Sequence, residues 1–101
     1  MGKSARERPV RLAEKLLQIR LSLGLSQNEM LAALGLKGKV LRSAISGFES
    51  GAREPALPVL LRYSQLAGVS TDYLINDKLD LPEHLPVTEY SEWIMPRQAS
   101  R

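Results

Sequence analysis

Cysteine is absent from the sequence, and histidine occurs only once, at His84. The absence of cysteine excludes a disulfide framework and a thiolate metal site. One histidine is too few for a histidine metal cluster, and neither a paired acid and base nor a nucleophile motif stands out. We therefore expect no bound metal, no cofactor and no enzymatic activity.

Long apolar runs are lacking as well. No run approaches the roughly 18 residues that can span a bilayer, and the N-terminal residues do not resemble a secretory signal. We therefore expect a cytoplasmic protein with no membrane association. The 101 residues leave room for one domain, and the composition, 44% hydrophobic and 25% charged, is typical of a globular chain.

Positive charge is in small excess and is unevenly distributed along the chain. The formal net charge is +3, yet residues 1–55 carry ten basic and five acidic side chains, whereas residues 56–101 carry four basic and six acidic. A basic half can attract a polyanion such as DNA through counterion release. A net charge of this size is also found on an ordinary solvated surface. Charge alone therefore leaves open both DNA binding and a surface that serves only solubility.

The spacing of apolar residues predicts an all-α fold, because they recur every three or four positions and nowhere alternate as in a half-buried strand. Five helices are expected, over residues 9–23, 27–34, 39–49, 57–67 and 70–75. Pro9 is suited to opening the first helix and Ser70 to capping the last, and Ser26 and Glu29 have the spacing of a capping box. The first four helices are expected to end at Gly24, Gly35, Gly51 and Gly68.

Helical spacing also predicts the core positions. The third helix has Val40, Leu41, Ala44, Ile45 and Phe48 on its apolar side, and the fourth offers Leu60, Leu61 and Leu66. The first helix has a main stripe of Leu12, Leu16, Ile19 and Leu23 and, nearly opposite, Val10, Leu17 and Leu21. Isolated exposed leucines are common, but three on one line favour a face covered by the C-terminal tail or by a second copy of the chain.

The two ends of the chain differ in composition from its middle. Residues 1–8 form a basic arm with Lys3, Arg6 and Arg8, residues 9–76 form the helical domain, and residues 77–101 form an acidic tail punctuated by prolines. The arm could add backbone or minor-groove contacts to DNA, or not touch DNA at all. The tail has room for one short helix around residues 88–95. Its acidic residues lack a calcium-loop pattern and are expected to be solvated.

One face of the third expected helix is suited to the major groove of DNA, which is about 12 Å wide and admits one α-helix. This face carries Arg42, Ser43, Ser46 and Gly47. An arginine can donate two hydrogen bonds to guanine, a serine can donate or accept, and a glycine permits close approach. We expect these four residues to contact base edges.

Three segments, LSQNEMLAALG, ISGFESGAREP and LAGVSTDYLI, resemble the helix-turn-helix domain of the lambda repressor/Cro family, also called the Xre family. They occur in the family's order, and the resemblance covers roughly residues 9–76. It implies a compact five-helix domain that binds double-stranded DNA. It also implies a sequence-specific transcriptional regulator, a repressor that binds a palindromic operator as a homodimer.

The resemblance further implies roles for individual residues. Phosphate contacts are implied for Gln27, Asn28 and Arg53, base contacts for Arg42, Ser43 and Ser46, and a structural salt bridge for Arg20 with Glu49. Gln27 and Asn28 would act together with the backbone amides at the start of the second helix.

One departure from the family concerns the turn before the third helix. Gly35 and Ile45 are separated by about one helical turn more than is usual in the family. The extra residues could lengthen the turn. Because Val40 and Leu41 continue the apolar spacing, we expect them instead to add a first turn to the helix, beginning near Lys39. Lys37 and Lys39 are then phosphate contacts or solvated lysines, and the sequence leaves both open.

A second class of function is a protein-interaction module. An antitoxin or adaptor could bind a protein partner through residues 77–101 and use the helical domain as a scaffold. Replacing Arg42 and Ser46 by alanine separates the two classes, because a regulator would lose its operator whereas an adaptor would keep its partner.

Overall fold

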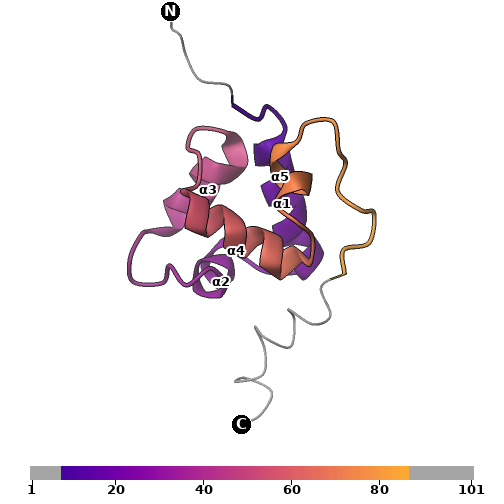
Figure 1. Ribbon diagram of the computed structural model, residues 1–101. Helices are drawn as coiled ribbons and strands as arrows, with labels where there is room; N and C mark the ends of the chain where they lie inside the picture. The colour runs from indigo at the N-terminus through magenta and orange to yellow at the C-terminus, as the bar shows by residue number, and fades with distance from the viewer. Residues whose placement is uncertain (1–7, 87–101) are drawn as a thin grey trace, which may run out of the picture.

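The structure, a computed structural model, describes residues 8–86 (Figure 1). Its five α-helices are α1 (Leu12–Leu23), α2 (Gln27–Ala33), α3 (Arg42–Ser50), α4 (Leu57–Ala67) and α5 (Asp72–Ile75). The described residues contain no strand, only an isolated bridge between Lys37 and Val40. The predicted all-α fold of five helices is confirmed. The helix expected around residues 88–95 lies outside the described residues.

Local sequence signals determine most helix ends. The Ser26 hydroxyl accepts a hydrogen bond from the Glu29 amide at 3.0 Å, and the Glu29 carboxylate accepts one from the Ser26 amide at 2.7 Å, so the predicted capping box is present. The predicted ends of α1, α3 and α4 are also confirmed, because Gly24, Gly51 and Gly68 are left-handed C-caps.

The predicted starts of α1 and α5 are wrong. α1 begins at Leu12 and not at Pro9, and the amides of Val10 and Arg11 donate instead to the Asp77 carboxylate at 3.0 Å each. This acceptor comes from the far end of the domain, so no local pattern predicts it. The N-cap of α5 is Thr71 and not Ser70, so this helix begins at Asp72, one residue later than the predicted cap implies.

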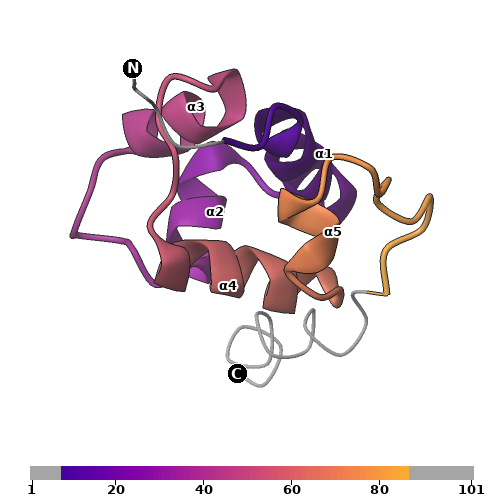
Figure 2. The ribbon, with the colours of Figure 1, turned by 45° about the horizontal axis from the view of Figure 1, so that its top comes forward.

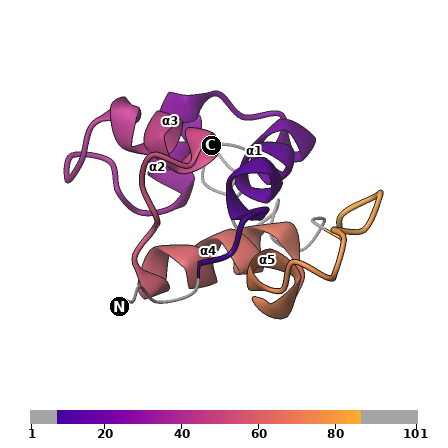
Figure 3. The same ribbon diagram turned by 90° about the horizontal axis from the view of Figure 1, so that it is seen from above.

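The helices pack around one apolar core, in which α1 contacts α3, α4 and α5, and α2 contacts α3. Figures 2 and 3 show α1, α2 and α3 together on one side of α4. The buried apolar residues are Leu12, Leu16, Ile19, Met30, Leu31, Leu34, Ala44, Ile45, Phe48, Leu60, Tyr63, Leu66, Ala67, Leu74 and Leu81.

Two leucines expected in the core are exposed. Leu61 is 49% exposed and Leu41 is 78% exposed. The buried stripe of α4 runs through Leu60, Tyr63 and Ala67, at spacings of three and four, which turns Leu61 to the outer side. Leu41 precedes α3 and does not belong to its helical face.

The expected second apolar face of α1 is smaller than predicted. Val10 precedes the helix and is exposed, so only Leu17 and Leu21 share that face; Leu17 is partly buried and Leu21 is exposed. The tail residues that we expected to cover it, Tyr90 and Trp93, lie outside the described residues, so its covering stays a prediction.

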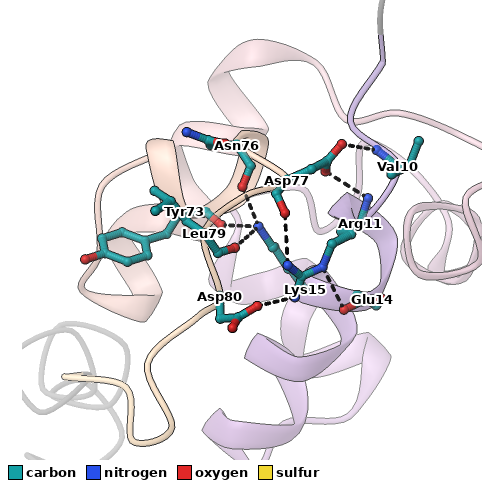
Figure 4. A network of polar contacts seen from close by, with 9 residues as sticks. All are labelled: Val10, Arg11, Glu14, Lys15, Tyr73, Asn76, Asp77, Leu79 and Asp80. Atoms are coloured by element: carbon teal, nitrogen blue, oxygen red, sulfur yellow. Dashed lines mark hydrogen bonds and ion pairs between the residues drawn. The ribbon is translucent and has the colours of Figure 1, made fainter.

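The segment that follows α5 folds back onto the core (Figure 4). Leu81 is buried in the core, and Leu85 packs against it. The buried Lys15 ammonium donates hydrogen bonds to the carbonyl oxygens of Tyr73, Asn76 and Leu79 at 2.7, 3.0 and 2.7 Å. The packed core therefore continues past residue 76, where the sequence changes in composition.

Two acidic residues of this segment, expected to be merely solvated, contact the start of α1. Besides accepting from two amides, Asp77 accepts a hydrogen bond from the Arg11 guanidinium at its backbone carbonyl, at 3.0 Å. Arg11 Nη2 lies 2.8 Å from Asp80 Oδ1. The amide hydrogen bonds hold the pKa of Asp77 below its ordinary value.

Candidate nucleic-acid interface

Helix α3 packs its apolar side against α1 and α2 and exposes its opposite side. Ala44, Ile45 and Phe48 are buried, as predicted. The exposed residues at the start of this helix are Arg42, Ser43 and Ser46. One surface therefore presents a guanidinium and two hydroxyls on a helix that is supported from behind, which is the arrangement that entry into a DNA major groove requires.

The extra residues before α3 lengthen the turn and add nothing to the helix. α3 begins at Arg42, so the predicted start near Lys39 is wrong. The Leu36 carbonyl accepts hydrogen bonds from the amides of Lys39 and Val40 at 2.8 and 3.3 Å, and Gly38 has a φ of +83°, which together close a tight turn. Figures 1 and 2 show this connection as an arc that stands away from the helices.

Apolar residues hold both ends of this arc on the core. Leu36 and Val40 pack against the buried core residues, whereas Lys37 and Lys39 are exposed. Val40 thus contributes to the core, but from the turn and not from α3. The two lysines place two positive charges on a short turn whose position is held by its flanking side chains.

Arg62 of α4 braces the end of α2, a contact that sequence reasoning missed. Its Nη1 donates a hydrogen bond to the Leu34 carbonyl at 2.6 Å. A Cβ added at Gly35 would collide with the Arg62 guanidinium, so the glycine leaves room for this contact. Arg62 and Leu34 are 28 positions apart, and no short-range pattern indicates such a pairing.

A buried ion pair joins α1 to α3. Arg20 Nε lies 2.6 Å from Glu49 Oε2, and the two side chains are only 14% and 7% exposed. Arg20 Nη2 also donates to Glu49 Oε1 at 3.1 Å, which makes the contact bidentate. These hydrogen bonds raise the pKa of Arg20. The salt bridge implied by the family resemblance is therefore present.

Gln27 and Asn28, both expected at phosphate, lie in the first turn of α2. The Gln27 side-chain amide donates to Glu49 Oε1 at 3.2 Å, so this residue ties α2 to the buried ion pair. Asn28 is exposed. Phosphate contact by either residue stays a prediction, and for Gln27 the structure adds a positioning role.

Gly47 lies beneath the Arg53 side chain. A Cβ added at Gly47 would come within 2.9 Å of the Arg53 side chain. The Arg53 guanidinium carbon lies 5.7 Å from the centre of the Phe48 ring, and the Arg53 amide donates to the Gly47 carbonyl at 3.1 Å. The close approach that we expected at Gly47 is thus made by Arg53, and base contact at Gly47 stays untested.

The expected arm contacts are only partly described. Arg8 Nε lies 3.7 Å from the Glu54 carboxylate, in the loop that follows α3. Lys3 and Arg6 lie outside the described residues. Between residues 8 and 86, no cluster of acidic or histidine side chains could hold a metal ion, and no helix is long and apolar enough to cross a membrane.

Comparison with known proteins identifies this domain. The helix-turn-helix family matches residues 16–74, more than half of the chain. The chain is 37% identical over 75 residues to YonR of Bacillus subtilis (strain 168), named an SPbeta prophage-derived uncharacterized HTH-type transcriptional regulator. The match covers 71% of this chain and 66% of that protein. No solved structure matches the chain. The protein therefore belongs to the Xre/lambda repressor-like helix-turn-helix family.

Proposed function

We propose that this protein is a sequence-specific DNA-binding transcriptional regulator, a repressor that binds a palindromic operator as a homodimer. The observation that carries the proposal is the exposed face of α3 formed by Arg42, Ser43 and Ser46. The family, and the printed name of the B. subtilis relative as a transcriptional regulator, support it.

Base contacts are assigned to the exposed face of α3. Arg42 can donate two hydrogen bonds to O6 and N7 of a guanine, and Ser43 and Ser46 can donate or accept at neighbouring base edges. Gly47 contributes by letting Arg53 lie close to the helix.

Phosphate contacts are assigned to the polar groups around this face. Gln27 and Asn28 belong to the start of α2, Lys37 and Lys39 to the turn, and Arg53 to the loop after α3. The arm residues Lys3, Arg6 and Arg8 would add further backbone contacts. Contacts of this kind fix the register of the protein on the duplex and carry little sequence information.

The homodimer follows from the size of one recognition helix, which contacts only a few base pairs. A two-fold operator presents two half-sites about 34 Å apart, so a dimer of the chain can bind both half-sites at once. Leu57 and Ile75, which are 79% and 44% exposed, border one groove and offer an apolar surface that a second copy could cover. Repression is proposed because occupancy of the operator is enough to exclude other proteins from it.

Selection from a pool of random duplexes tests the function. We expect an enriched palindrome whose half-site centres are about one turn of DNA, roughly 34 Å, apart. Light scattering of the complex should give two chains per duplex, and a reporter behind the selected operator should be repressed. If no sequence is enriched, the proposed function is wrong.

A double variant tests the assignment of the face. Arg42→Ala with Ser46→Ala should lose the selected operator, while the matched surface variant Lys78→Ala with Ser22→Ala should retain it. If the Arg42 and Ser46 variant still prefers the operator, α3 does not determine the sequence bound. An adaptor would show no operator at all and would bind its protein partner equally well in both variants.

A further inference from the structure

Leu41 is an exposed apolar residue at the start of the recognition helix. Its side chain is 78% exposed, and it is the N-cap of α3, directly before Arg42. Its backbone is extended, with φ −89° and ψ 163°. Because successive side chains of an extended chain point in opposite directions, the partial burial of Val40 is consistent with the outward direction of Leu41.

Neither the core nor the helix explains a leucine at this position. N-cap positions favour serine, threonine, aspartate and asparagine, whose side chains accept a hydrogen bond from the first turn, and leucine is a poor choice there. α2 has such a cap at Ser26, whereas α3, like α1, α4 and α5, has no side-chain cap hydrogen bond. A residue that breaks a local rule without benefit to packing is expected at a functional site.

The position of Leu41 indicates its partner. Leu41 directly precedes Arg42, and Arg42 belongs to the face that we assign to base edges. If α3 lies in the major groove, its N-cap residue Leu41 enters the groove with it. In that groove thymine alone presents a methyl group, and apolar side chains recognise it by contact. Burying an exposed leucine against a methyl group removes apolar surface of both from water.

We propose, on the basis of the proposed function, that Leu41 recognises the C5-methyl group of a thymine adjacent to the base pair contacted by Arg42. The contact makes Leu41 a specificity-determining residue beside the polar face. The selected operator should therefore contain a thymine at one fixed position in each half-site.

Replacement of thymine by deoxyuridine tests the contact, because it removes the methyl group and keeps every hydrogen-bonding atom of the base. Each thymine of the selected operator is replaced in turn, and affinity is measured by fluorescence anisotropy. For the wild type we expect a loss of about fourfold per half-site at one position, the equivalent of about 0.8 kcal/mol for one methyl-sized group.

Variants of Leu41 assign this loss to the residue. Leu41→Ala should bind the thymine and uracil duplexes equally, whereas Leu61→Ala, at an exposed leucine on the outer side of α4, should keep the full difference. Leu41→Ser should lose the discrimination as well, yet unfold at a higher temperature, because serine supplies the missing N-cap. A purely structural role for Leu41 would make stability and thymine preference fall together.

Two results would overturn the inference while leaving the proposed function intact. One is equal wild-type affinity for thymine and uracil at every position of the operator, as expected if Leu41 instead contacts another protein. The other is a Leu41→Ala protein that retains the wild-type discrimination. If no operator is enriched at all, the proposed function fails and the assignment of Leu41 fails with it.

Discussion

At the scale of single residues, Tyr63 places its ring in the core and buries a hydroxyl that is unpaired among the described residues. It lies in α4 with no exposed surface, and its hydroxyl has no hydrogen-bond partner among the described residues. Burial raises the pKa of Tyr63, because the charged phenolate loses more solvation free energy on burial than the neutral phenol does. The unpaired hydroxyl loses its hydrogen bonds to water on folding and gains none in return.

Tyr63→Phe should therefore raise the free energy of unfolding, by up to about 1 kcal/mol in urea denaturation. Since the folded pKa lies above the unfolded value of about 10, the unfolded state ionises first, and the stability of the wild type should fall as pH rises above about 10. The variant should lack this alkaline loss, which Tyr73→Phe should retain. A large destabilisation by Tyr63→Phe would show that the hydroxyl is hydrogen-bonded.

At the scale of helices, one buried carboxylate sets the position of three elements. Glu49 of α3 accepts hydrogen bonds from Arg20 of α1 and from Gln27 of α2. Arg20 also donates to the Leu25 carbonyl at 2.9 Å, between α1 and α2. The position of α3, and with it that of its exposed residues, is therefore tied to α1 and α2 through a carboxylate near the end of the same helix.

Glu49→Ala should lower the free energy of unfolding by about 3 kcal/mol, because it leaves the Arg20 guanidinium buried without its carboxylate. Urea denaturation measures the change. Replacing both partners, as Arg20→Met with Glu49→Leu, should retain most of the wild-type stability, since no uncompensated charge then remains. If the double variant were no more stable than Glu49→Ala, the loss would come from packing rather than from the stranded charge.

The turn between α2 and α3 is the second element with a measurable role. If Lys37 and Lys39 contact phosphates, each change to alanine should weaken binding about equally on all sequences and reduce the slope of log K against log salt by about one. Lys78→Ala, remote from the turn, should leave the slope unchanged. Unchanged slopes for both turn variants would mean that these lysines are merely solvated.

At the scale of the whole molecule, the start of α1 and the segment after α5 hold each other in place. Asp77 accepts hydrogen bonds from two amides of residues 10 and 11, and Lys15 donates to three carbonyls of residues 73–79. These contacts hold the residues that follow the N-terminal arm beside the first residues of the C-terminal tail (Figure 4). Neither end of the described chain is packed independently of the other.

This link makes the free energy of unfolding depend on pH in the acid range. The folded pKa of Asp77 is lowered, so its stabilising contribution is present above the unfolded pKa of about 3.9 and is lost as pH falls through the folded pKa. Asp77→Asn should be less stable than the wild type at pH 7, and the difference should shrink below about pH 4. Thermal denaturation from pH 2 to 7 measures it. Glu83→Gln is the matched control, and a difference independent of pH would show that the charge of Asp77 is unimportant.

The sequence was sufficient wherever the deciding interaction is local. The capping box of Ser26 and Glu29, the C-cap at Gly24 and the buried stripe of Ile45 and Phe48 each depend on residues a few positions apart. Motifs of the same range were enough to indicate the helix-turn-helix family and the exposed residues of α3. Local spacing also misled, because Leu41 continues the apolar pattern of a helix to which it does not belong.

By itself, then, the sequence determined the fold class, most helix ends and which residues of α3 are exposed. Only the tertiary structure decided the form of the turn before α3, the support of Leu34 by Arg62 and the pairing of Lys15 and Asp77 with the opposite end of the domain. The physical reason is range. Helical spacing and capping depend on a few successive residues, whereas a buried charge is satisfied by whatever groups the folded chain brings to it, from any distance along the sequence.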